Sequence, residues 1–265
     1  MTALPPPIDH AARYRQHLQA CGYTPKPASA WDARAAQAGW KRRHDDYSDA
    51  FLARLDLHGV DSVLDVGCGP GLLSLPIAAR VRQVHALDYS PGMLDGLRAA
   101  IARDGIGNIQ PWQLAWDDDW SAVPRCDVAI ASRSLMVPDL AQALAKLDAH
   151  ARRRACITFT TGPRAGVTEL AALLGRAWIP MPDHRYPINL LLDMGREPRV
   201  DYLPLSPPDR ERDAEELLQQ VESLFGGLTP AEQQSVRAWH AASPDNRLGL
   251  APTRRWAFIW WETAG

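Results

Sequence analysis

A stretch with three alternate glycines, residues 62–71 (SVLDVGCGPG), constrains the fold of this chain more than any other feature. The apolar residues before the glycines are typical of a buried strand, and a run of helical character from Leu72 to Val81 follows them. Glycine lacks a Cβ and tolerates positive φ, so the backbone can turn sharply and a polar ligand can approach the amides at the helix start. The stretch therefore predicts a strand, a ligand-binding turn and a helix in an α/β protein.

Acidic residues at the ends of two expected strands extend this pattern. Residues 84–87 read as the second strand and lead into Asp88, which lies 21 residues after Gly67. An acid at this point can accept hydrogen bonds from both hydroxyls of a ribose. Asp65 places a carboxylate at the end of the first strand, at the sheet edge where open α/β folds bind their ligands. We therefore expect a ribose-containing ligand.

The two blocks DVGCGPG (65–71) and DYSPGML (88–94) together resemble the class I S-adenosylmethionine-dependent methyltransferases. The resemblance implies a three-layer α-β-α Rossmann-like sheet of seven strands, mostly parallel with an antiparallel last strand, together with a helical lid and a helical insertion. It also implies S-adenosylmethionine as methyl donor and S-adenosylhomocysteine as product. A nicotinamide- or flavin-binding Rossmann domain would instead need a small third residue in G-x-G-x-x-G/A, where this chain has Leu72.

The resemblance further implies which residues bind the cofactor. In this family an acidic residue after the third strand accepts a hydrogen bond from the amino group of adenine, and an apolar neighbour covers the adenine ring. Asp117 and Trp116 fit these roles best, Asp118 is one step away, and the alternative is that the three consecutive aspartates form a solvated turn. The expected cofactor-binding residues are Asp65, Gly67, Cys68, Gly69, Gly71, Asp88, Tyr89, Met93, Trp116, Asp117 and Ser132.

The net charge and the residues that follow the fourth expected strand both indicate the class of methyl acceptor. A formal net charge of −2 gives no reason to expect a nucleic-acid backbone as partner. After the fourth expected strand the chain reads SRS (132–134), and not the N/D-P-P-Y/F of enzymes that methylate amino groups of nucleic-acid bases. We therefore expect a small-molecule acceptor. The alternatives are a protein or RNA acceptor, aminopropyl transfer from the same cofactor, and a module that binds S-adenosylmethionine without catalysis.

Methyl transfer from a sulfonium is an in-line displacement, so alignment of the acceptor supplies much of the rate and a general base is optional. Arg133 follows the fourth strand, whose end faces the transferred methyl in the resembled fold, and its guanidinium suits a carboxylate or phosphate. The alternative for Arg133 is a structural salt bridge to Asp65 or Asp117. For a hydroxyl acceptor, a base near the methyl group would help to remove its proton, and the candidates are His44, Tyr47, His184 and Tyr186.

The remaining segments suggest covers around this core. Residues 1–59 contain three expected helices, and WDARA (31–35) resembles a sequence common in the lid of these methyltransferases; the alternative is that its aromatic residues only dock the segment. Asp9 can cap the first helix, and Ser29 with Asp32 has the spacing of a capping box at the start of the second. We expect a helical lid at 1–59 and a core at 60–265 with insertions at 161–185 and 206–253.

The first insertion is expected to be a long loop, and Thr229 with Glu232 has capping-box spacing at the start of a helix in the second. The last strand, residues 255–261 (RWAFIWW), is a continuous apolar run, so we expect it to be buried on both faces.

The four cysteines are scattered, and the sequence shows neither a leader pattern nor an apolar stretch long enough to cross a bilayer. We therefore expect a cytoplasmic protein. We also expect a monomer or homodimer. No cluster of residues has metal-ligand spacing, so we expect no bound metal.

Overall fold

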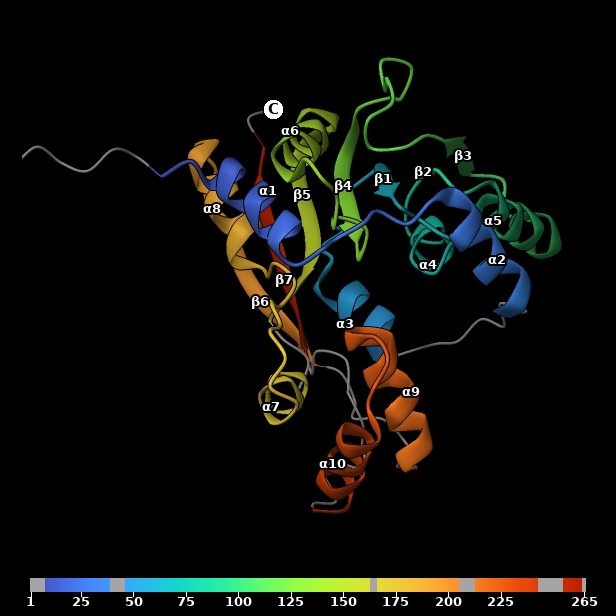
Figure 1. The fold of residues 1–265 in the computed structure, drawn as a ribbon. Coiled ribbons are helices and arrows are strands. Elements are labelled where there is room, and N and C mark those ends of the chain that lie inside the picture. Colours follow the sequence, from blue (N-terminus) through green and yellow to red (C-terminus); the bar gives the residue numbers. More distant parts are fainter. Residues whose placement is uncertain (1–7, 39–45, 163–165, 205–212, 243–254, 264–265) are drawn as a thin grey trace, which may run out of the picture.

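A computed structural model of the chain describes residues 8–38, 46–162, 166–204, 213–242 and 255–263. Its centre is a sheet of seven strands in the order β3-β2-β1-β4-β5-β7-β6 (Figure 1). The strands are β1 (Ser62–Val66), β2 (Gln83–Asp88), β3 (Ile109–Gln113), β4 (Cys126–Ser132), β5 (Ala151–Thr160), β6 (Arg199–Pro204) and β7 (Arg255–Glu262). Neighbouring strands among β1 to β5 pair in parallel, whereas β7 runs antiparallel to both β5 and β6. The predicted seven-strand sheet with its antiparallel last strand is confirmed.

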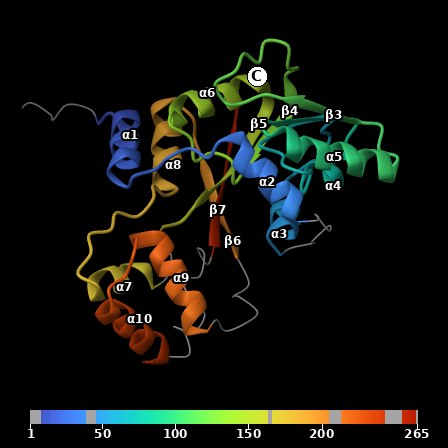
Figure 2. The same ribbon diagram turned by 45° about the vertical axis from the view of Figure 1, so that its right-hand side comes forward.

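Helices cover both faces of this sheet, because alternate side chains of each strand point to opposite faces. In β7, Ala257, Ile259 and Trp261 belong to one core cluster and Phe258 to the other. The first cluster includes side chains of α1, α6 and α8, and the second those of α3, α4 and α5 (Figures 1 and 2). The helices of the described residues are α1 (His10–Ala20), α2 (Ala28–Ala38), α3 (Asp46–Arg54), α4 (Ser74–Ala78), α5 (Pro91–Asp104), α6 (Leu140–His150), α7 (Val167–Leu173), α8 (Arg185–Asp193), α9 (Ala214–Phe225) and α10 (Pro230–Ala242).

The starts of the helices test the capping predictions. Asp9 caps α1 by accepting the Ala12 amide at 2.8 Å, and Thr229 and Glu232 form the expected capping box at the start of α10. The expected box at Ser29 and Asp32 is wrong, because α2 already begins at Ala28 and the Asp32 carboxylate binds donors of another helix. Helix α4 is also shorter than the predicted 72–81.

The two insertions pack against each other, which the sequence did not indicate. Residues 161–185, expected as a loop, contain α7, and the apolar faces of α7, α9 and α10 form a third, separate cluster. Arg176 ties this unit together by pairing with Glu232 at 2.8 Å and donating to the Phe225 carbonyl oxygen. In both views this unit lies beyond the carboxyl end of β5, the strand that precedes α7, and apart from the sheet (Figures 1 and 2). The insertions thus form one small helical module at the carboxyl edge of β5.

Candidate functional site

The glycine turn joins β1 to β2, since the amides of Gly67 and Cys68 donate to the Leu87 carbonyl oxygen at 2.7 and 2.9 Å. Gly67, Gly69 and Gly71 all have positive φ, at 72°, 54° and 92°.

The three glycines differ in what surrounds them. A Cβ on Gly67 would lie 2.3 Å from the Cβ of Ser134, and one on Gly71 would lie 2.6 Å from Cδ1 of Leu97. On Gly69 it would meet nothing closer than the Met93 sulfur at 4.0 Å. Of the three, only Gly69 has room for a ligand against the backbone.

Asp88 is fixed directly beside that open glycine. Its Oδ2 accepts the Gly69 amide at 2.8 Å, and its Oδ1 accepts the Ser90 amide at 2.9 Å. The residue is 8% exposed, and burial raises its pKa although the backbone donors act in the opposite direction. A carboxylate has about four lone-pair sites, so two amide donors leave acceptor capacity for two hydroxyls. This geometry fits the ribose of a bound nucleoside.

Helix α2 reaches the same place through Asp32. Its Oδ1 accepts the Ser90 hydroxyl at 2.6 Å and the Gly92 amide at 2.9 Å. The Ser90 hydroxyl also caps α5 by accepting the Met93 amide at 3.1 Å. One chain of hydrogen bonds therefore links Asp32, Ser90, Asp88 and Gly69. We did not predict this role of Asp32; the only signal in the sequence was the WDARA stretch.

Tyr89 ties the segment before α2 to the same region, since its hydroxyl donates to the Lys26 carbonyl oxygen at 2.9 Å. Met93 is buried at the start of α5, with its sulfur facing Gly69. Met93 thus lies beside the open glycine, and Tyr89 contacts the segment that leads into α2.

Asp65 lies behind the turn and is 1% exposed. The Ser74 hydroxyl donates to its Oδ2 at 2.5 Å, and burial raises the pKa of this carboxyl to about 7. Burial likewise raises the pKa of the neighbouring Cys68 thiol. In this structure both residues are part of the packed base of the turn.

We expect Asp65→Asn to stabilise the ligand-free protein at pH 8 and to have little effect at pH 4. A folded-state pKa of about 7, above the usual 3.8, means that this group supports the fold at low pH and loses that contribution as pH rises through about 7. Asparagine stays neutral and keeps an acceptor for Ser74, so the gain at pH 8 is on the order of a few kcal/mol. Urea unfolding at both pH values measures it.

Asp127 provides the control of opposite sign. It is more exposed, and the amides of Asp61 and Ser62 outweigh its partial burial and lower its pKa. Its contribution is therefore present at neutral pH and lost in acid, so Asp127→Asn destabilises at pH 8. Equal effects of Asp65→Asn at pH 4 and pH 8 would contradict the buried-acid assignment.

A second polar group lies at the carboxyl ends of β4 and β5, next to α3 (Figure 1). The buried Tyr47 hydroxyl lies 2.6 Å from both Ser132 Oγ and Thr158 Oγ1. The Arg133 amide donates to Thr158 Oγ1 at 3.0 Å, and its guanidinium carbon stands 4.1 Å from the centre of the Tyr47 ring. Three residues predicted from the sequence, Tyr47, Ser132 and Arg133, therefore meet here.

The salt-bridge alternative for Arg133 is not realised, because its guanidinium forms no ion pair within the described parts of the chain. The next residue, Ser134, connects this group to the glycine turn: its hydroxyl donates to the Val66 carbonyl oxygen at 2.7 Å. The two polar groups are thus neighbours.

The other candidate bases lie elsewhere. His184 precedes α8; its amide donates to the Thr160 carbonyl oxygen, and its Nε2 is 3.4 Å from the Tyr202 hydroxyl. Its Nδ1 is buried without a hydrogen bond from any described residue, and burial lowers the pKa of this imidazole. The Tyr186 hydroxyl lies 2.9 Å from Nδ1 of His17 on α1. His44 lies outside the described residues.

The aspartates after β3 divide between two roles. Asp118 accepts the Ala115 amide and Asp119 accepts the Ser121 amide, so both shape the turn as the alternative reading held. The exposed Asp117 carboxylate accepts no hydrogen bond from the residues that the structure describes. Beside it, the Trp116 indole donates to the Ser134 carbonyl oxygen at 3.0 Å. Asp117 and Trp116 stay predicted adenine contacts.

Comparison with known proteins assigns the family. Residues 63–154 match the model of a methyltransferase domain family. An uncharacterized Haemophilus influenzae protein is 31% identical over 259 residues, which cover 96% of this chain and 97% of that protein. The malonyl-[acyl-carrier protein] O-methyltransferase of Serratia marcescens is 30% identical over 172 residues, 64% of this chain and 60% of that protein. The chain belongs to the class I S-adenosylmethionine-dependent methyltransferases.

The fold of this methyltransferase is also that of solved relatives. The N-methyltransferase NodS of Bradyrhizobium japonicum in complex with S-adenosylhomocysteine superposes with a TM-score of 0.55 at 10% identity, covering 90% of this chain and 98% of that one. Membership of this family makes S-adenosylmethionine the cofactor of the methyltransferase. The open space at Gly69 and the fixed Asp88 carboxylate fit its ribose. None of the described helices of the methyltransferase is both long and apolar enough to cross a membrane.

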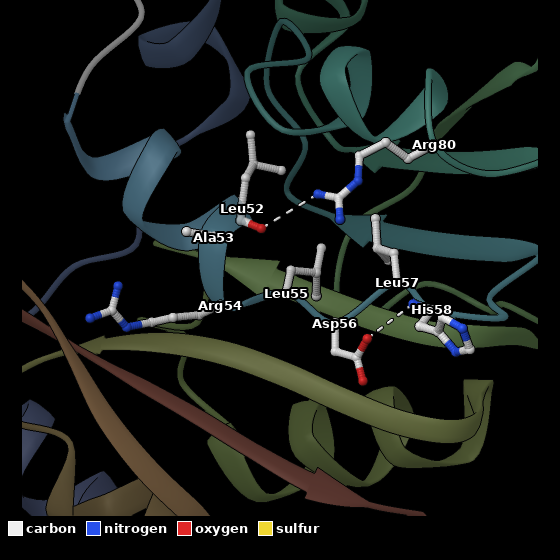
Figure 3. Close-up of a pocket in the computed structure, with 8 residues that line it drawn as sticks. All are labelled: Leu52, Ala53, Arg54, Leu55, Asp56, Leu57, His58 and Arg80. Carbon is white, nitrogen blue, oxygen red and sulfur yellow. Dashed lines mark hydrogen bonds between the residues drawn. The ribbon is translucent and has the colours of Figure 1, made fainter.

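A hollow of about 640 Å³ lies on another part of the methyltransferase, lined by residues 52–58 and Arg80 (Figure 3). Here Arg80 donates to the Leu52 carbonyl oxygen, and the His58 amide donates to Asp56. The lining residues precede β1, whereas the glycine turn follows it. The hollow therefore lies at the opposite edge of the sheet and contains none of the motif residues.

Proposed function

We propose that this methyltransferase transfers the methyl group of S-adenosylmethionine to a small-molecule acceptor at the carboxyl ends of β1, β4 and β5. The observation that carries the proposal is the Asp88 carboxylate, which is held beside the one glycine of the turn that has open space. The Tyr47–Arg133 group is joined to this turn through Ser134, so an acceptor there would face the donor.

The predicted site residues that gather around the glycine turn and the ends of β4 and β5 have distinct roles in this proposal. Bound S-adenosylmethionine supplies an electrophilic methyl group on a sulfonium. Asp88 accepts the ribose hydroxyls, while Asp117 and Trp116 hold the adenine. The buried members of the turn shape its backbone. Ser132 and Tyr47 orient groups at the acceptor side, where positioning supplies much of the rate.

The relatives and the charge bear on the class of acceptor. The name of the Serratia relative describes O-methylation of a malonyl group carried on a protein, which keeps a protein-bound acyl group as the second candidate acceptor. The formal net charge of −2 offers no electrostatic attraction for a nucleic acid. We also propose a cytoplasmic location, which the four free cysteines support, and a monomeric or homodimeric state.

The test follows an isotope-labelled methyl group. The purified chain, labelled S-adenosylmethionine and a cell extract are incubated, and small molecules are then separated from macromolecules by ultrafiltration. Label in the small-molecule fraction is the expected result. Label only in protein or RNA would contradict the small acceptor, and cofactor binding with no S-adenosylhomocysteine formed would contradict catalysis.

We further propose that residues 1–59 act as a lid, with α2 held over the cofactor site by Asp32. Replacing Asp32 by alanine leaves the Ser90 hydroxyl and the Gly92 amide without their acceptor and loosens the start of α5 next to Asp88. We expect about tenfold weaker binding of S-adenosylmethionine, the equivalent of one lost hydrogen bond, measured by isothermal titration calorimetry.

Asp32→Asn is the matched control for this lid prediction. Asparagine keeps the acceptor oxygen and removes only the charge, so its affinity should stay close to that of the unchanged protein. If Asp32→Ala also binds the cofactor normally while remaining folded, α2 does not support the site.

A further inference from the structure

Arg133 has an unusual backbone conformation. Its φ is 57°, and no other non-glycine residue in the described ranges has a positive φ. The left-handed conformation is unfavourable for a residue with a Cβ, and such strain persists only where the surroundings enforce it. Residues of this kind gather at functional sites, so the contacts that hold Arg133 are informative.

Those contacts come from two neighbouring elements. Thr158 of β5, itself 1% exposed, accepts the Arg133 amide, and the buried Tyr47 hydroxyl is hydrogen-bonded to the same threonine oxygen. The Tyr47 ring lies under the guanidinium. The backbone and the side chain of Arg133 are therefore both placed by buried groups, while the residue itself remains exposed.

The guanidinium has unused binding capacity. Other arginines of this chain pair with carboxylates: Arg54 with Asp201, Arg176 with Glu232 and Arg196 with Asp148. Within the described ranges, the Arg133 guanidinium contacts the face of the Tyr47 ring and pairs with no carboxylate. A ring face occupies none of the five N–H donors of a guanidinium. A fixed, exposed and unpaired guanidinium is suited to a planar oxyanion bound by two parallel hydrogen bonds.

Arg133 lies close to the expected site of the methyl donor. Ser134, the next residue, packs against Gly67 and donates to the last carbonyl of β1. Arg133 thus stands one residue from the glycine turn, at the strand end beside β1.

We propose that Arg133 binds an oxyanionic group, a carboxylate or phosphate, of the methyl acceptor, with Tyr47 as the residue that positions it. This inference rests on the proposed function and adds the substrate class: the acceptor is an anion. The positive φ of Arg133 serves to direct its side chain over the Tyr47 ring.

The first test fractionates the acceptor before labelling. A small-molecule extract is passed over an anion-exchange resin at neutral pH, and retained and unretained fractions are supplied to the protein with labelled S-adenosylmethionine. Acceptor activity is expected in the retained fraction. Activity confined to the unretained fraction would overturn the proposal. Treating the retained fraction with a phosphatase distinguishes the two sources, since a phosphate acceptor is lost and a carboxylate acceptor survives.

The second test uses variants of Arg133 on that retained fraction. Arg133→Gln should lower the rate at limiting acceptor by about 10- to 100-fold, as expected for lost hydrogen bonds to a charged group, with the affinity for S-adenosylmethionine unchanged. Arg133→Lys should recover only part of the rate, because it keeps the charge and loses the fork. Arg98→Gln, on the exposed side of α5, is the matched control and should leave the rate unchanged.

The variant Arg133→Gly separates the proposed binding role from a purely structural role of Arg133. Glycine relieves the positive φ, so this variant should melt at the same temperature as the unchanged protein or higher while it loses acceptor activity. Retained activity in Arg133→Gln or Arg133→Gly would refute the subsite.

If the unchanged protein transfers no label at all, the proposed function fails, and the subsite is then judged by direct titration with sodium malonate and inorganic phosphate. Binding of either anion that disappears in Arg133→Gln would support the subsite, and equal responses of the two proteins would overturn it.

Discussion

Asp88→Asn is expected to weaken S-adenosylmethionine binding by about 100-fold. Each hydrogen bond from a ribose hydroxyl to an ionised carboxylate contributes about 1.5–3 kcal/mol, and an asparagine amide cannot accept at both positions. The substitution also places an NH₂ group against one of the two backbone amides that Asp88 now accepts, from Gly69 and Ser90. Isothermal titration calorimetry with S-adenosylmethionine and S-adenosylhomocysteine measures the effect, which should be similar for both ligands because they share the ribose.

Asp95→Asn provides the comparison for Asp88. Asp95 lies on the same helix, α5, in an exposed pair with Arg98, and its loss should leave cofactor affinity unchanged. Thermal unfolding without ligand shows whether either variant is folded. Affinity of the Asp88 variant equal to that of the Asp95 variant would show that the ribose assignment is wrong.

The parts of the molecule that sequence reasoning predicted are those with a local cause. The strand, the turn and the acid of the donor site lie within residues 62–88, and each follows from side-chain alternation, glycine geometry or strand-end position. The same holds for β7, whose continuous apolar run predicted a strand buried on both faces. Local patterns therefore predicted these elements, and the resemblance of the two blocks 65–71 and 88–94 to a known family implied the methyl donor.

The parts that escaped prediction are contacts between residues far apart in the sequence. Asp32 was expected to cap its own helix, yet the Ser90 hydroxyl and Gly92 amide of another helix bind it. Gly67 was expected to leave room for a ligand, whereas the space is filled by Ser134. The module of α7, α9 and α10 joins two insertions across the chain. No periodicity or motif records such partners, because they arise only when the elements pack.

Because Gly67 is packed against Ser134 and Gly69 faces open space, the same substitution by alanine should have different consequences at the two positions. Both have positive φ, so alanine at either position costs about 1–2 kcal/mol in backbone strain. Gly67→Ala also drives a Cβ to 2.3 Å from Ser134, and we expect a total loss of about 3 kcal/mol or more of unfolding free energy. Gly69→Ala should show the strain alone, but it should weaken cofactor binding because its methyl occupies the open space. Urea unfolding and calorimetry separate the two effects.

Ser134→Gly tests whether the clash is the cause. On its own it removes the hydroxyl that donates to Val66 and should destabilise the protein modestly. Combined with Gly67→Ala it also removes the Cβ that the new methyl would strike, so the double variant should be more stable than the sum of the single effects predicts, by about 1–3 kcal/mol. Additive effects would mean that the backbone at Gly67, and not contact with Ser134, excludes a side chain there; Gly67→Ala and Gly69→Ala would then destabilise the protein equally.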